Sequence, residues 1–191
     1  MSTAIWTPVS LAVVSAGTGD LRPTRLLADW VAEAVCRSLA AGGARAEVEV
    51  VELHRLTADL ARHASRGRAG PDLREAVAAV VTADGLVVGT PVLAASPSRV
   101  FDLFFAVFGD GILRGMPVLL ALNGDSCRQP PDPAQAVRRR LSDVHAAPMP
   151  TVVVACPADW QATAPSVAGR LHVRIGRAPA ELAAAMCAQR Q

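Results

Sequence analysis

A loop rich in hydroxyl groups, glycine and arginine follows the first apolar run of the chain and leads into an amphipathic segment. Ser15, Thr18 and Thr24 supply its hydroxyls, and Arg22 and Arg25 supply positive charge. When a helix starts just after a buried strand, its unpaired N–H groups and its dipole attract anions. Arginine adds strong charge-assisted hydrogen bonds to phosphate. We therefore predict that these five residues bind a phosphate group.

Two well-known phosphate-binding motifs are excluded. A P-loop requires Gly-Lys-Ser/Thr, and the chain contains no lysine. The dinucleotide fingerprint Gly-x-Gly-x-x-Gly requires a third glycine, and Arg22 stands at that position. The remaining class is a mononucleotide phosphate held by hydroxyls and backbone amides, as in flavodoxin-like folds.

A second loop with small and polar residues follows the apolar run that begins at residue 85. It contains Pro91, Val92, Leu93, Ala94 and Ser96. Small side chains at these positions would let a flat ring approach the backbone, so we predict that the loop contacts a ligand ring. An open alternative is that the serines only cap the following helix.

A third loop, which contains Asn123, Gly124 and Asp125, follows another apolar run. Its polar groups are suited to the edge of a heterocycle, although Asn-Gly also forms ordinary turns. We expect Asp159 and Trp160, after the last apolar run, to serve packing and capping.

The cysteines and histidines suggest neither a metal site nor a nucleophile. The four cysteines lie far apart, without a Cys-x-x-Cys pair or a histidine at ligand spacing, so we expect reduced thiols. The four histidines are dispersed, and the sequence offers no convincing general base. We therefore expect no catalytic side chain and no metal, which suits a reaction whose hydride chemistry is carried by a cofactor.

The composition indicates one globular domain over residues 1–191. Of these residues, 51% are hydrophobic and 19% are charged, which allows a substantial core. The net charge is only +2 and the arginines are scattered, which argues against nucleic acid. No apolar run approaches the roughly 18 residues of a membrane span, and no signal peptide is evident. We expect a cytoplasmic protein without a membrane partner.

Five strand patterns alternate with five helix patterns, which predicts a doubly wound parallel sheet. The strands are expected at 8–15, 47–53, 85–91, 117–122 and 149–156, and the helices at 24–41, 73–82, 97–108, 133–146 and 181–189. The second strand alternates glutamate with apolar residues and so belongs at an edge. The prediction is a flavodoxin-like three-layer α/β sandwich with a five-stranded parallel sheet of order 2-1-3-4-5. Residues 59–72 and 160–176 are expected to be loops, the latter with a short strand at 171–175.

In such a sheet, ligands bind beyond the carboxyl ends of the strands at the switch point, which brings the three loops together. Four phenylalanines share one face of the third helix, as core or as a subunit interface: Phe101, Phe104, Phe105 and Phe108.

Taken together, these segments resemble the NAD(P)H-dependent FMN reductase family of flavodoxin-like proteins, especially its actinobacterial type. The resemblance spans roughly residues 9–160, with matching pieces at 13–17, 24–29, 49–53, 83–86, 90–92, 96–98, 104–105, 115–120 and 158–160. It implies that FMN binds with its phosphate in loop 15–25 and its ring against loops 90–98 and 122–127. It also implies NAD(P)H as hydride donor, a homodimer or homotetramer, and a flavin-dependent monooxygenase as possible acceptor of reduced FMN.

The chain departs from the family pattern inside these loops. Arg22 and Pro23 replace serines, Leu93-Ala94 replaces an aromatic-Asn pair, and Asn123-Gly-Asp replaces Thr-Gly-Gly. Two alternatives therefore stay open: a degenerate member that serves as a scaffold or partner subunit, or an enzyme that uses the same crevice for another substrate.

Overall fold

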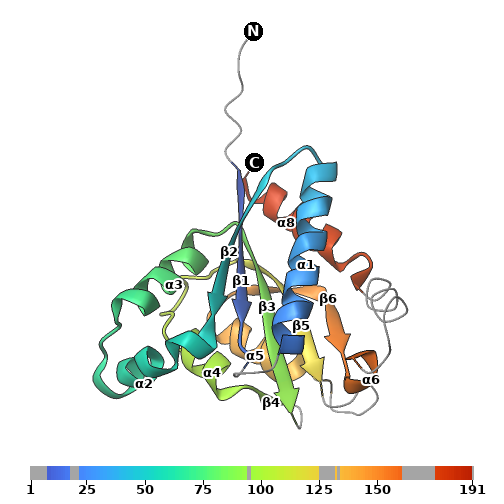
Figure 1. Ribbon diagram of the computed structural model, residues 1–191. Coiled ribbons are helices and arrows are strands. Elements are labelled where there is room, and N and C mark those ends of the chain that lie inside the picture. Colours follow the sequence, from blue (N-terminus) through green and yellow to red (C-terminus); the bar gives the residue numbers. More distant parts are fainter. Residues whose placement is uncertain are drawn as a thin grey trace.

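The computed structural model describes residues 8–17, 22–93, 96–124, 132, 134–160 and 175–190. Its centre is a sheet whose five parallel strands lie in the order β2-β1-β3-β5-β6 (Figure 1). These strands are β1 (Val9–Ser15), β2 (Ala46–Glu52), β3 (Gly85–Leu93), β5 (Pro117–Gly124) and β6 (Ala147–Ala155). The predicted order 2-1-3-4-5 is confirmed, and β2 lies at the predicted edge.

A sixth strand, β4 (Ser96–Pro97), was not predicted. It pairs antiparallel with the end of β3, where Val92 is opposite Pro97 and Leu93 is opposite Ser96. A two-residue strand leaves no periodic signal in a sequence. Its effect is to turn the chain back on itself at the carboxyl end of β3.

Helices cover both faces of the sheet (Figure 1). One face carries α1 (Arg22–Ala41) and α8 (Ala178–Ala188), and the other carries α3 (Pro71–Thr82), α4 (Arg99–Phe105) and α5 (Ala134–Asp143). Successive strand residues alternate between two cores, so that Leu11 and Val13 pack on the α1 face while Ala12 and Val14 pack on the other. Burial on both faces explains the continuous apolar runs of the sequence.

The predicted loop at 59–72 is wrong. After the short helix η1 (Leu53–Leu56), the chain forms α2 (Thr57–Arg66), which ends where Gly67 adopts a positive φ of 66°. Leu60 is the one buried side chain of α2, and the segment is polar overall, so its composition suggested a loop. In the second predicted loop, residues 161–174 lie outside the described part, and Ile175 is helical and buried rather than extended.

The four phenylalanines are core residues. They are at most 5% exposed, and neighbouring ring centroids lie 4.7–5.8 Å apart. Of the two predicted roles, core packing is therefore the one observed. These side chains are not available for a subunit interface.

Two glycines let helices approach β3 closely. A Cβ atom on Gly89 would lie 2.9 Å from the Cβ of Ala28 and 3.3 Å from the carbonyl oxygen of Thr24. A Cβ on Gly85 would lie 2.6 Å from the Cγ of Met186 in α8. Because real Cβ atoms do not make such contacts, Gly89 fixes the first turns of α1 against the carboxyl half of β3.

Candidate functional site

The carboxyl ends of β1, β3 and β5 meet at one edge of the sheet, beside the start of α1 (Figure 1). The register places Ser15 opposite Gly89, and Pro91 opposite Asn123. The described starts of the three predicted loops therefore lie at one edge of the sheet. Of the predicted site residues, Thr18, Ala94 and Asp125 lie outside the described residues, as does the side chain of Arg22.

Thr24 carries a buried polar atom without a partner. It is the third residue of α1, its side chain is fully buried, and within the described part of the chain its Oγ1 has no hydrogen bond. Leaving a buried hydroxyl unpaired costs about 1–3 kcal/mol. An acceptor such as a phosphate oxygen would satisfy this hydroxyl at the end of the helix where the dipole also favours an anion. Ser15, at the end of β1, is also buried.

Arg25 is paired with two carboxylates of the protein. Its Nε lies 2.8 Å from Asp29 Oδ1 and its Nη1 lies 2.5 Å from Glu52 Oε1. Burial acts to lower the pKa of Arg25, but the hydrogen bonds and charges of Asp29 and Glu52 outweigh it and raise the pKa. The guanidinium is therefore positively charged, and its charge is balanced by Asp29 of α1 and Glu52 of β2.

The second predicted loop presents one large apolar side chain. Pro91 and Val92 are buried, whereas Leu93 is 65% exposed. Ser96 is exposed in β4, and the neighbouring Ser98 caps α4 by accepting from the Phe101 N–H at 3.4 Å. Leu93 therefore offers an apolar surface for a ring, while helix capping falls to Ser98.

Trp160 contacts a predicted site residue, and sequence reasoning missed this contact. It ends α6 (Pro157–Trp160), and its indole Nε1–H donates to Asn123 Oδ1 at 2.9 Å. Gly124, which follows Asn123 in β5, is buried. The only signal in the sequence was an Asp-Trp pair directly after the fifth strand, which also fits ordinary packing.

The expectation of four reduced cysteines is wrong for Cys156, which is disulfide-bonded. Cys36 and Cys187 are free, and Cys127 lies outside the described residues. Burial raises the pKa of the Cys36 thiol, so this thiol is not activated as a nucleophile. Among the described residues no group of three or more His, Cys, Asp or Glu could hold a metal ion. Within the same residues, no helix has the length and apolarity needed to cross a membrane.

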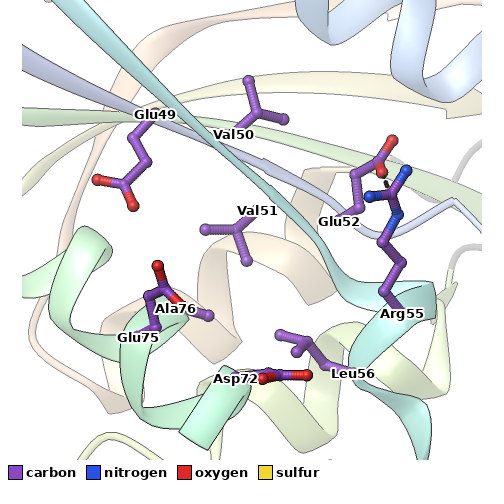
Figure 2. Close-up of a pocket in the computed structure, with 9 residues that line it drawn as sticks. All are labelled: Glu49, Val50, Val51, Glu52, Arg55, Leu56, Asp72, Glu75 and Ala76. Carbon is purple, nitrogen blue, oxygen red and sulfur yellow. Dashed lines mark ion pairs between the residues drawn. The ribbon is translucent and has the colours of Figure 1, made fainter.

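A cavity of about 220 Å³ lies elsewhere, between β2, η1 and α3 (Figure 2). The carboxylates of Glu49, Asp72 and Glu75 surround an apolar floor that includes Val51, as Figure 2 shows. Glu52 and Arg55 also line the cavity and pair with each other at 2.6 Å, which leaves the three other carboxylates without a balancing charge among the lining residues. So many negative charges repel a phosphate, which excludes this cavity as the nucleotide phosphate site.

Known proteins are similar to this chain in sequence. The chain is 30% identical to NADH-dependent FMN reductase SfnE of Pseudomonas putida over 175 residues, which cover 90% of this chain and 91% of that protein. It is 34% identical to NADH-dependent FMN reductase SfnF of the same organism over 121 residues, which cover 63% and 62% of the two chains.

Solved structures share the fold. An oxidoreductase from Corynebacterium diphtheriae superimposes with a TM-score of 0.84 at 33% identity, covering 95% of this chain and 98% of that one. The apo form of NADH:FMN oxidoreductase EMOB superimposes with a TM-score of 0.69 at 20% identity, covering 92% and 90%. The family model described as NADPH-dependent FMN reductase matches residues 9–161, and the chain therefore belongs to that family.

Proposed function

We propose that this protein is an NAD(P)H-dependent FMN reductase whose FMN phosphate binds at the start of α1. The observation that carries the proposal is the fully buried Thr24 hydroxyl, which has no hydrogen-bond partner among the described residues. Ser15 and the first amides of α1 complete the phosphate site, and the predicted roles of Thr18 and Arg22 are retained in the proposal. Family membership and the names of the relatives support this assignment.

The ring of FMN is proposed to lie against Leu93 and the end of β5. Leu93 supplies exposed apolar surface and Asn123 supplies a polar edge. Ala94, Ser96, Gly124 and Asp125 are retained as candidate ring contacts. Bound FMN would accept a hydride from the nicotinamide at its N5 atom. The contribution of the chain is to bind and orient the two nucleotides, which requires no general base.

Reduced FMN then passes to an acceptor, for which we propose a flavin-dependent monooxygenase. The relatives are named for FMN as substrate, and a reductase with a flavin substrate releases reduced flavin for use elsewhere. A cytoplasmic homodimer or homotetramer belongs to the same proposal. The alternative of a degenerate scaffold is less favoured. In a protein that no longer binds FMN, an unpaired buried hydroxyl would only lower the stability.

The test is flavin binding by Thr24→Val, which removes the hydroxyl and keeps the shape of the side chain. Affinity for FMN should fall by 1.5–3 kcal/mol, the scale of a hydrogen bond to a charged group, or roughly 10- to 150-fold. Riboflavin, which has no phosphate, should bind as before. The apoprotein should unfold at the same or a higher temperature, because the substitution removes an unpaired buried hydroxyl.

Thr24→Ser is the matched control, since it keeps the hydroxyl and should keep most of the FMN affinity. Flavin fluorescence titration measures the affinity of each variant for FMN and for riboflavin. Equal losses for FMN and riboflavin would show that Thr24 acts on the fold or the ring. Absence of FMN binding by the unaltered protein at ~100 µM, far above a micromolar Kd, would overturn the proposed function.

A further inference from the structure

The side chain of Trp160 connects β5 with α1. Its indole N–H donates to Asn123 Oδ1 at 2.9 Å, across 37 residues of sequence. Its ring stacks on Trp30 of α1, with centroids 6.0 Å apart and an interplanar angle of 27°. A single side chain thus holds the amide at the carboxyl end of β5 against the helix that begins at the candidate phosphate site.

The turn that leads into α6 holds Trp160 in place. The Oδ2 atom of Asp159 accepts from the backbone N–H of Cys156 at 2.9 Å, and the Asp159 N–H donates to the Cys156 carbonyl at 2.8 Å. Asp159 is 5% exposed and Cys156 is disulfide-bonded. Because the turn is fixed by these contacts and the ring by Trp30, the direction of the indole N–H is fixed as well.

This hydrogen bond determines which end of the Asn123 amide remains available. An indole N–H can only donate, so the amide must present its oxygen to Trp160 and its Nδ2 elsewhere. Within the part of the chain that the structure describes, Nδ2 has no hydrogen-bond partner. Asn123 is half-buried and lies opposite Pro91 of β3. The candidate site therefore contains an amide donor of defined orientation.

We propose that Trp160 is a positioning residue that directs the Asn123 Nδ2–H groups toward an acceptor on the flavin ring. The oxygens and unprotonated nitrogens of the isoalloxazine pyrimidine edge are such acceptors. The inference rests on the proposed function. It concerns the ring and not the phosphate, so FMN, riboflavin and lumiflavin, which has neither ribityl chain nor phosphate, should all depend on Trp160.

The first variant is Trp160→Phe, which keeps an aromatic ring on Trp30 and removes the N–H. We expect affinity for FMN, riboflavin and lumiflavin to fall by a similar factor, about 5- to 30-fold, as for one hydrogen bond of about 1–2 kcal/mol. Trp30→Phe is the control, because it leaves the indole N–H of Trp160 intact. The loss of flavin binding free energy in Trp30→Phe should be less than half of the loss in Trp160→Phe.

A double-mutant cycle separates positioning from packing. Trp160→Phe added to Asn123→Ala should weaken flavin binding no further than Asn123→Ala alone. Asn123→Asp keeps an acceptor for the indole but removes the Nδ2 donors, so it should lose flavin affinity while the Trp160 indole resonance in the NMR spectrum of the apoprotein stays at a hydrogen-bonded position. Asn123→Leu should shift that resonance upfield.

Two results would overturn the inference while leaving the proposed function intact. One is flavin binding by Trp160→Phe that equals that of the unaltered protein. The other is additive losses in the cycle, which would make Trp160 an ordinary packing residue. If the unaltered protein binds none of the three flavins, the proposed function and the inference both fail.

Discussion

Two edges of the same sheet differ in whether their polar groups are solvated or paired. At the β2 edge, charged groups either face water or pair with one another, as Glu52 does with Arg25 and Arg55. At the carboxyl edge of β1, β3 and β5, the Thr24 hydroxyl is buried without a partner. Water satisfies an exposed carboxylate, but none of the residues that the structure describes satisfies the Thr24 hydroxyl. A dry, unpaired group therefore points to a ligand site more strongly than an open acidic cavity does.

The largest effect that tests this comparison is expected from Gly89→Ala. The new Cβ would press on Ala28 and on the carbonyl of Thr24, and overpacking of this kind costs ~1–3 kcal/mol. Because the same contact positions Thr24, FMN affinity should fall together with the free energy of unfolding. Urea denaturation and flavin titration measure the two quantities.

Gly109→Ala is the matched control, since its added Cβ would lie 3.7 Å from the nearest described atom, Ile112 Cδ1. Adding Ala28→Gly to Gly89→Ala should recover part of the FMN affinity. If Gly89→Ala leaves both quantities unchanged, the first turns of α1 are not fixed by this contact.

Arg25→Met tests whether Arg25 belongs with the paired charges of the β2 edge or with the candidate phosphate site. The structure pairs its guanidinium with Asp29 and Glu52 at partly exposed positions, so its removal should cost ~1 kcal/mol of stability or less. Affinity should change by less than about threefold, and equally for FMN and riboflavin, on the scale of such a weak exposed pair. A loss of tenfold or more that is confined to FMN would instead place Arg25 on the phosphate, as the sequence suggested.

The smallest effect is expected from neutralising the acidic cavity with Asp72→Asn and Glu75→Gln together. At 0.15 M salt, charges further apart than ~8 Å are largely screened, so FMN affinity should change by no more than about twofold. Isothermal titration calorimetry at two salt concentrations measures this. Much tighter FMN binding by the double variant would mean that the nucleotide binds at the β2 edge.

The sequence predicted the fold well because strand burial and strand order leave local signals. The apolar runs located all five parallel strands, and the Glu/Val alternation located β2 at the edge. The two-residue β4 and the weakly apolar α2 left no such signals. Thr24 was predicted to bind phosphate from its place after a buried strand, and this role stays a proposal.

Side-chain partners far apart in the sequence could not be predicted. The pairing of Arg25 with Glu52 spans 27 residues, and that of Trp160 with Asn123 spans 37. Both depend on how α1, β2, β5 and α6 meet in space. Residue spacing along the chain does not predict such contacts. From the sequence we therefore assigned Arg25 to a phosphate and Trp160 to packing.

The unpaired Thr24 hydroxyl has a consequence for how much folded protein a cell can maintain. A ligand that binds only the folded chain stabilises it by about 2.7 kcal/mol when its free concentration is 100 times its Kd. With FMN as that ligand, the thermal midpoint should rise with flavin concentration, and less so for Thr24→Val. Flavin starvation would then shorten the lifetime of the protein, because the apoprotein unfolds and is degraded more often. The supply of the cofactor would thereby regulate the abundance of the enzyme without any change in its gene expression.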